Sequence, residues 1–145
     1  MYFEEFELGM EWPVDPVEIT REEMLAYAHA YDPAPIHADE EHGRNSNFGD
    51  IISPGTMAGM LLWKNWLKYR VQGDEFIAGT SCLMEWYKPV MAGDTLHGRA
   101  YVHELEDRNH KNGRVCVKID GYNQNGEHVL STFNNIIQKK KGTAK

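Results

Sequence analysis

The chain has 145 residues, of which 41% are hydrophobic and 26% charged, a composition typical of one globular domain covering residues 1–145. Its formal net charge of −7 argues against a nucleic-acid partner, because phosphate backbones recruit surplus Lys and Arg. No apolar run approaches the ~20 residues that a membrane span needs, and Met1–Glu5 lacks the basic start of a signal peptide, so we expect a cytoplasmic protein without a membrane partner.

The first part of the chain predicts short extended pieces followed by a helix. Residues 2–19 alternate loosely between apolar and polar side chains and contain one glycine and two prolines. Thr20 and Glu23 have the spacing of a capping box, in which both side chains satisfy free amides at a helix start. The apolar residues behind it recur at helical spacing: Met24, Tyr27, Ala28 and Tyr31. Because the ring of Pro33 disfavours the helical conformation of the residue before it, this helix should end at Asp32.

The segment from Asp32 to His37 is predicted to be non-helical and unusually stiff. Its sequence is Asp-Pro-Ala-Pro-Ile-His, and the two prolines fix two φ angles and reduce the freedom lost on folding. A short helix is predicted around Asp39–Arg44, and Asn45–Gly49 has the composition of a loop.

A second long helix is predicted to begin at Ser53-Pro54-Gly55, with Ser53 as the N-cap and Pro54 at the first helical position. Every residue from Met57 to Trp63 is apolar or glycine, and a helix that is apolar on all sides belongs inside a protein. It is too short to span a membrane, so it is predicted to be buried. The aromatic side chains near its end are expected to pack in the core: Trp63, Trp66 and Tyr69.

Long strands are predicted for the rest of the chain. The segments rich in β-branched and aromatic residues are Phe76–Tyr87, Thr95–Glu106, Arg114–Tyr122 and His128–Gln138. Their connections have turn chemistry, so consecutive strands are expected to form an antiparallel meander. Together with the buried helix this predicts an α+β fold, in which a strongly curved sheet wraps around the helix. Cys82 and Cys116 lie in these strands and are expected to be buried free thiols rather than a disulfide framework.

Two stretches resemble the signature of the MaoC-like dehydratases and (R)-specific enoyl-CoA hydratases. Residues 31–37 read Tyr-Asp-Pro-Ala-Pro-Ile-His, and residues 48–55 read Phe-Gly-Asp-Ile-Ile-Ser-Pro-Gly. The family pattern is Asp-x-Asn-Pro-aliphatic-His, followed by a glycine that opens the central helix. Residues 2–6 and 88–96 also resemble the family, so the likeness covers nearly the whole chain. It implies the hot-dog fold and a homodimer or higher homo-oligomer, with the site at the subunit interface.

The chain departs from the family pattern at three positions near the expected site. Ala34 stands where the family usually has Asn, which removes a side-chain hydrogen bond that helps to shape the loop. Pro54 replaces a frequent His, and Ala58 replaces a Ser that some members carry. These departures leave the acid/base pair intact and bear on the substrate and the rate.

The resemblance implies reversible addition of water to a trans-2-enoyl-CoA, giving an (R)-3-hydroxyacyl-CoA, with Asp32 and His37 as the acid/base pair. This reaction needs a base for the water, a proton for the α-carbon and a site for negative charge on the thioester oxygen. The amide of Gly55 is the candidate for the last role, because a helix start offers unpaired N–H groups and Pro54 has none. Which of Asp32 and His37 is the formal base stays open.

No metal or redox cofactor is implied, and the acyl-CoA thioester is the small-molecule substrate. The acyl chain stays open, as do the residues that bind the CoA phosphates and the choice between CoA and an acyl carrier protein. Some of the helix tryptophans could line an acyl tunnel. The other histidines show no metal-ligand spacing, and positions facing solvent explain them: His29, His42, His97, His103, His110 and His128.

Two other functions are carried as alternatives. A hot-dog acyl-CoA thioesterase would use the same Gly55 amide but cleave the thioester. A non-catalytic acyl-CoA-binding subunit of a heteromeric hydratase would fit the alanines at positions 34 and 58. Taken on spacing alone, Asp32 would be a turn residue and His37 a structural histidine more often than a catalytic pair.

Overall fold

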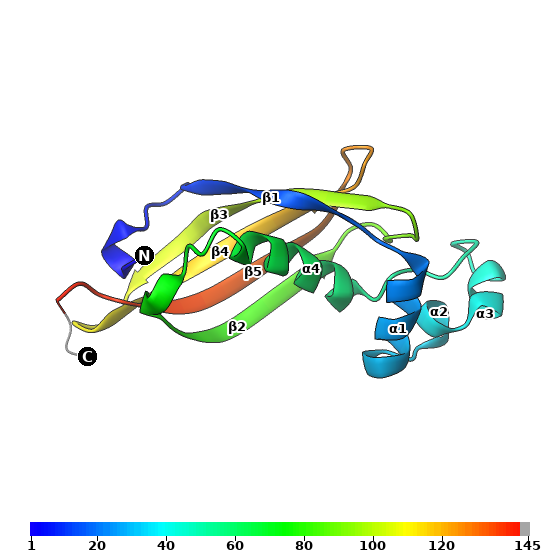
Figure 1. The fold of residues 1–145 in the computed structure, drawn as a ribbon, viewed down its shortest axis with the longest axis horizontal. Helices are drawn as coiled ribbons and strands as arrows, with labels where there is room; N and C mark the ends of the chain where they lie inside the picture. Colours follow the sequence, from blue (N-terminus) through cyan, green and yellow to red (C-terminus); the bar gives the residue numbers. More distant parts are fainter. Residues whose placement is uncertain (143–145) are drawn as a thin grey trace.

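The computed structural model describes residues 1–142, in which one antiparallel five-stranded sheet curves along a single long helix (Figure 1). The strands are β1 (Glu11–Glu18), β2 (Phe76–Trp86), β3 (Thr95–Asp107), β4 (Asn112–Tyr122) and β5 (His128–Lys139). The helices are α1 (Arg21–Tyr31), α2 (Pro35–Ala38), α3 (Glu40–Arg44) and α4 (Gly55–Leu67), with 3-10 turns η1 (Phe3–Glu5) and η2 (Gly73–Glu75). All four predicted long strands are present, and no helix within residues 1–142 is long and apolar enough to cross a bilayer.

The order of the strands in the sheet is β1-β3-β4-β5-β2, which differs from the predicted meander. Strands β3, β4 and β5 are consecutive neighbours, whereas β2 pairs with β5 and not with β3. The prediction is wrong at this connection because residues 87–94 do not form a tight hairpin. They bridge three strand spacings of ~4.8 Å, about 14 Å in all, which an extended segment of this length spans easily.

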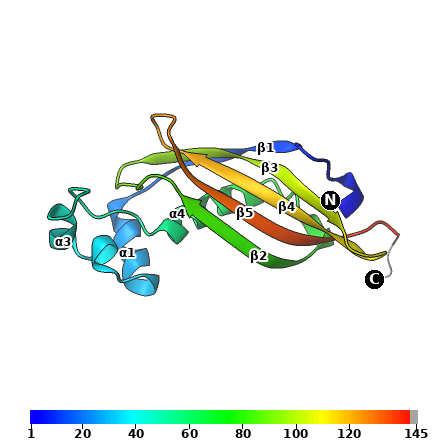
Figure 2. The same cartoon turned by 180° about the vertical axis from the view of Figure 1, so that it is seen from behind.

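The two edges of the sheet differ in how they present their backbone. Strand β1 contains Pro13 and Pro16, and its register with β3 shifts between Val14 and Val17. Proline cannot donate to a ladder and is therefore confined to edges and bulges. Strand β2 lies at the opposite edge (Figure 2). It contains no proline and exposes every residue except Met84. The edge at β2 is thus open to pairing.

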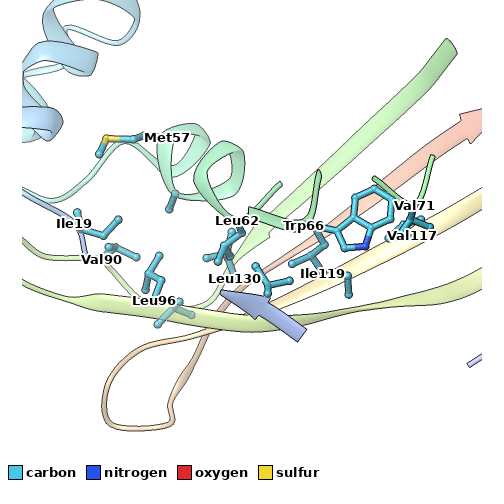
Figure 3. Packing of buried hydrophobic residues seen from close by; sticks show 14 of the residues in the cluster. Ile19, Met57, Leu62, Trp66, Val71, Val90, Leu96, Val117, Ile119 and Leu130 are labelled. Atoms are coloured by element: carbon cyan, nitrogen blue, oxygen red, sulfur yellow. The ribbon is translucent and has the colours of Figure 1, made fainter. Parts of the chain in front are cut away.

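Helix α4 packs one face against the concave side of the sheet. Figure 3 shows Leu62 and Trp66 of the helix among the core residues, with Ile119 and Leu130 from β4 and β5. A Cβ at Gly121 would lie 2.6 Å from Leu62 Cδ1, so this glycine allows the close approach of helix and strand. Burial of each such side chain contributes roughly 1.5–3 kcal/mol.

The opposite face of α4 is not covered by residues 1–142 of the same chain. Met60 is 47% exposed and Leu67 36%, so the expectation of burial on every side is wrong for one protomer. Of the aromatic side chains expected in the core, Trp66 is fully buried and Trp63 is partly buried against it, at a ring-centroid distance of 5.1 Å. Tyr69 is exposed and donates a hydrogen bond to Asp15 Oδ1 at 2.9 Å instead, because it follows the last turn of the helix.

Both cysteines are free thiols, as predicted, but they differ in exposure. Cys116 is buried, and burial raises the pKa of its thiol. Cys82 is exposed, contrary to prediction, because no strand among residues 1–142 pairs with the outer edge of β2.

Helices α1, α2 and α3 form a separate group at one end of the sheet, away from the end where both termini lie (Figures 1 and 2). Thr20 begins α1 as predicted, accepting a hydrogen bond from the Glu23 amide at 3.2 Å. The second half of the predicted capping box does not form, because the Glu23 carboxylate accepts from the Thr20 hydroxyl at 2.9 Å and not from the Thr20 amide. The N-terminal end of α4 points toward this group, and the segments that join them carry the predicted site residues.

Candidate active site

Asp32 stands immediately after α1, where the chain leaves the helix. Its amide still donates to the Ala28 carbonyl at 2.9 Å, but its backbone has φ −150° and ψ 74° because Pro33 follows. The predicted helix end is therefore confirmed. The side chain is 41% exposed.

His37 lies in the short helix α2, whereas the whole segment from Asp32 was predicted to be non-helical. The prediction holds for Pro33 and Ala34 and is wrong from Pro35 onward. Proline suits the first helical position, since its φ is already helical and its missing N–H would be unpaired there. Ala34 is the N-cap of α2 and provides no side-chain hydrogen bond. The Ala34 substitution thus removes the residue type that caps helices well.

One hydrogen bond fixes the orientation of the His37 ring. Nδ1 lies 2.8 Å from the carbonyl oxygen of Ile52. A carbonyl can only accept, so in the neutral ring Nδ1 carries the hydrogen and Nε2 has a free lone pair. Nε2 lies 3.5 Å from Oδ2 of Asp32, and the His37 side chain is only 15% exposed. Two acceptor atoms at this separation can contact the same small ligand.

The segment that holds His37 is itself fixed on several sides. The Ile52 amide donates to the Ile36 carbonyl at 3.1 Å, and the Ser53 amide donates to the Val90 carbonyl at 2.7 Å. Asp50 accepts hydrogen bonds from the Arg21 guanidinium at the start of α1, one of them at 3.0 Å. This charged hydrogen bond lowers the pKa of the Asp50 carboxyl to about 2. The links join α1, α2 and the segment before α4 into one support for the ring.

Helix α4 begins at Gly55, one residue later than predicted, and Pro54 occupies the N-cap position. Ser53 is therefore not the cap, and its hydroxyl donates to the Pro54 carbonyl at 3.2 Å. That carbonyl also accepts from the amides of Met57 and Ala58 at 3.1 and 3.5 Å. Within the part of the chain that the structure describes, the amides of Gly55 and Thr56 have no backbone acceptor. They are the free donors at this helix start.

Gly55 also has a steric role. A Cβ at this position would lie 2.3 Å from Cε2 of the Trp86 indole, far inside van der Waals contact. The indole belongs to the last residue of β2, so the absence of a side chain at Gly55 allows the end of this strand to close over the start of α4.

The predicted residues Asp32, His37 and Gly55 line one cavity of about 460 Å³. The other residues that line it are Phe48, Ile52, Ser53, Thr56, Trp86, Tyr87, Lys88, Pro89 and Val90. The cavity thus combines an acid/base pair and a helix start with mostly apolar walls. None of Trp63, Trp66 and Tyr69 lines it. Among residues 1–142, no three His, Cys, Asp or Glu side chains gather in a way that could hold a metal ion.

A family model described as the FAS1-like dehydratase domain region, which covers MaoC-like dehydratases, matches residues 7–132. The chain belongs to this family. Its curated relatives include the uncharacterized protein YdeM of Bacillus subtilis, 26% identical over 141 residues, with 97% of this chain and 100% of YdeM covered. Mesaconyl-CoA hydratase of Cereibacter sphaeroides is 43% identical over 60 residues, which are 41% of this chain and 18% of that enzyme.

Solved structures show the same architecture, so the MaoC-like chain has the predicted hot-dog fold. A monoamine oxidase regulatory protein from Archaeoglobus fulgidus matches with a TM-score of 0.91 and 26% identity, covering 97% of this chain and 95% of that one. A MaoC-like dehydratase from Rhodospirillum rubrum matches at 0.87 and 22%, covering 99% of each chain. The R-hydratase PhaJ1 from Pseudomonas aeruginosa matches at 0.73 and 20%, covering 99% of this chain and 92% of that one.

The sequence did not point to every residue that lines the site of this MaoC-like protein. The sequence placed Trp86 and Tyr87 only at the end of a predicted strand. No local sequence pattern indicates that this strand end lies beside the start of α4. Tyr27 was assigned to the helix spacing of α1. Its hydroxyl lies 2.8 Å from the Thr56 hydroxyl, so it joins α1 to the first turn of α4. These contacts depend on the tertiary arrangement.

Proposed function

We propose that this MaoC-like protein adds water reversibly to a trans-2-enoyl-CoA and forms an (R)-3-hydroxyacyl-CoA. The observation that carries the proposal is the 3.5 Å separation of Asp32 Oδ2 and His37 Nε2, in a cavity that also contains the start of α4. The family and the hydratases among its relatives and structural neighbours support this class of reaction. The mostly apolar walls of the cavity suit an acyl chain.

In the proposed reaction the Asp32–His37 pair holds one water molecule. The water oxygen forms a bond to the β-carbon while one of its protons passes to the pair. The electrons of the carbon–carbon double bond move to the thioester oxygen, and the pair then delivers a proton to the α-carbon. One water is consumed, and no electron donor or acceptor is needed. Because Nδ1 of His37 keeps its hydrogen on the Ile52 carbonyl, Nε2 is the ring atom that exchanges protons.

The Gly55 amide stabilises the negative charge on the thioester oxygen. It lies at the positive end of the α4 dipole and has no backbone acceptor among the described residues. The loss of one such donor costs on the order of 10²–10³ in kcat in well-studied enzymes. The Thr56 amide in the same turn is a second possible donor.

We further propose that the protein is a homodimer joined along β2. The supporting observations are the unpaired, proline-free edge of this strand and its exposed side chains Phe76, Ile77 and Leu83. An edge of this kind pairs readily with a second copy. Since Trp86 and Tyr87 at the end of the strand line the cavity, the second copy would lie beside the site.

The test uses the purified protein with crotonyl-CoA and follows the loss of enoyl absorbance. Hydration is expected in the wild type, and Asp32→Asn and His37→Gln should each abolish most of it without loss of the folded circular-dichroism spectrum. Chiral analysis of the product should give the (R) isomer. Wild-type rates in both variants would refute the assignment of the site. Release of free thiol from a saturated acyl-CoA would indicate the thioesterase instead.

A further inference from the structure

We propose that Lys88 binds the phosphate of the phosphopantetheine arm that carries the thioester, and that Glu127 holds the lysine at the rim of the cavity when no substrate is bound. The inference rests on the proposed function, because it requires that the substrate in the cavity is a thioester on such an arm. The phosphate could belong to coenzyme A or to the prosthetic group of an acyl carrier protein.

The position of Lys88 is fixed by its backbone. The amides of Tyr87 and Lys88 both donate to the Val129 carbonyl, at 2.8 and 3.3 Å, so the segment after β2 is attached to the start of β5. Among the described residues that line the cavity, Lys88 is the only Lys or Arg. A single cation at the mouth of a site, on a chain of net charge −7, is a specific feature for an anionic ligand to recognise.

The Lys88 ammonium forms an ion pair with Glu127, which follows the β4–β5 turn. The other carboxylate oxygen of Glu127 accepts a hydrogen bond from Asn123 Nδ2 at 3.1 Å, so the carboxylate is held by the turn as well as by the lysine. The hydrogen bond from Lys88 lowers the pKa of Glu127.

This ion pair is easily exchanged. The Lys88 side chain is 50% exposed and that of Glu127 40%, and ion pairs exposed to water contribute little net free energy. A phosphate carries more charge and more acceptor oxygens than a carboxylate, so it competes well for the ammonium. The flexible four-carbon stem lets the ammonium follow an arm that leaves the cavity at the rim. Glu127 therefore holds the Lys88 ammonium beside the cavity until the phosphate replaces the carboxylate as its partner.

The experiment compares crotonyl thioesters that share the acyl group and differ in the arm. These are crotonyl-CoA, crotonyl acyl carrier protein and crotonyl-N-acetylcysteamine, which has no phosphate. Lys88→Ala should raise KM about tenfold for a phosphate-bearing ester, the scale of one charge-assisted contact, and change it less than twofold for the cysteamine ester. Lys88→Arg should restore most of the loss, and Glu127→Gln should lower KM for the same ester. The carrier whose KM responds identifies the source of the phosphate.

Lys68→Ala is the matched control, since it removes the same charge at the far end of α4, about 20 Å from Gly55 along the helix. It should leave KM for all three esters unchanged. An equal rise of KM for all three esters in Lys88→Ala would overturn the phosphate assignment and leave the hydratase intact. Calorimetric titration with free coenzyme A and with pantetheine provides a readout without turnover. If no ester is hydrated but Lys88→Ala weakens only coenzyme A binding, the proposed function fails and the phosphate site stands, whereas unchanged coenzyme A binding overturns the site.

Discussion

The absence of a side chain at Gly55 leaves room for the Trp86 indole, which lies across the start of α4. The amide of the same residue is the one proposed to bind the thioester oxygen. At His37 one carbonyl also has two effects. The Ile52 carbonyl orients the ring and determines which ring nitrogen faces Asp32. In both places a backbone group sets the geometry of the site.

Gly55→Ala is expected to damage both functions of this position. The new methyl group would lie 2.3 Å from the Trp86 ring, and overpacking of this kind typically costs about 1–3 kcal/mol. The displaced ring and the blocked approach to the amide should reduce kcat for crotonyl-CoA on the order of 10²-fold. Thermal unfolding and steady-state rates measure the two effects. A Gly55→Ala enzyme with the wild-type rate and Tm would contradict this account.

At the scale of elements, the sequence predicted those features of helices and strands that depend on residues close together in the chain. The cap at Thr20, the helix end at Asp32 and the long strands follow from local propensities, and they are present. Pairing of β2 with β5 follows from where residues 87–94 run, and no local pattern encodes that path. The prolines near His37 could not be interpreted from local sequence alone either. Pro33 follows the end of α1, whereas Pro35 begins α2. Resemblance to a family pointed to Asp32, His37 and Gly55, whereas Trp86 needed the fold.

Helix α2 is short and lacks a capping side chain, and this suggests a stabilising substitution. Ala34→Asn should supply an oxygen that accepts from an amide of the first turn of α2, and a good N-cap is worth about 1 kcal/mol. The Tm of the purified protein should therefore rise by several degrees. Ala30→Asn places the same side chain at an exposed position in the last turn of α1, where the Asp32 amide already donates to the Ala28 carbonyl, and should give no increase. An equal Tm for Ala34→Asn and the wild type would mean that the Ala34 position does not limit the stability of α2.

At the scale of the whole molecule, two uncovered apolar regions lie next to each other. The exposed side of α4 includes Met60, and a cavity of about 380 Å³ is lined by Met60 and Trp63 together with residues of β2 and β5. The open edge of β2 adds the exposed side chains of Ile77 and Leu83. Leu83 alternates with Met84, which faces α4, and therefore lies on the other face of the sheet. The proposed second copy, paired along β2, would cover the edge of the sheet and the exposed face of α4, and would account for the apolar sequence of α4 on all sides.

The double variant Ile77→Lys and Leu83→Lys tests this assembly. Pairing would desolvate the new charges and bring like charges together across the two copies, so the equilibrium should shift to the monomer. Sedimentation equilibrium should give twice the chain mass for the wild type and the single chain mass for the variant. Leu8→Lys adds a charge at another exposed leucine, outside β2, and should leave the dimer intact. Because Trp86 and Tyr87 line the site, the monomeric variant should also lose hydration of crotonyl-CoA while it keeps its folded spectrum. A wild-type protein that sediments as a monomer at all concentrations would exclude β2 as an interface, and the apolar face of α4 would then require another partner.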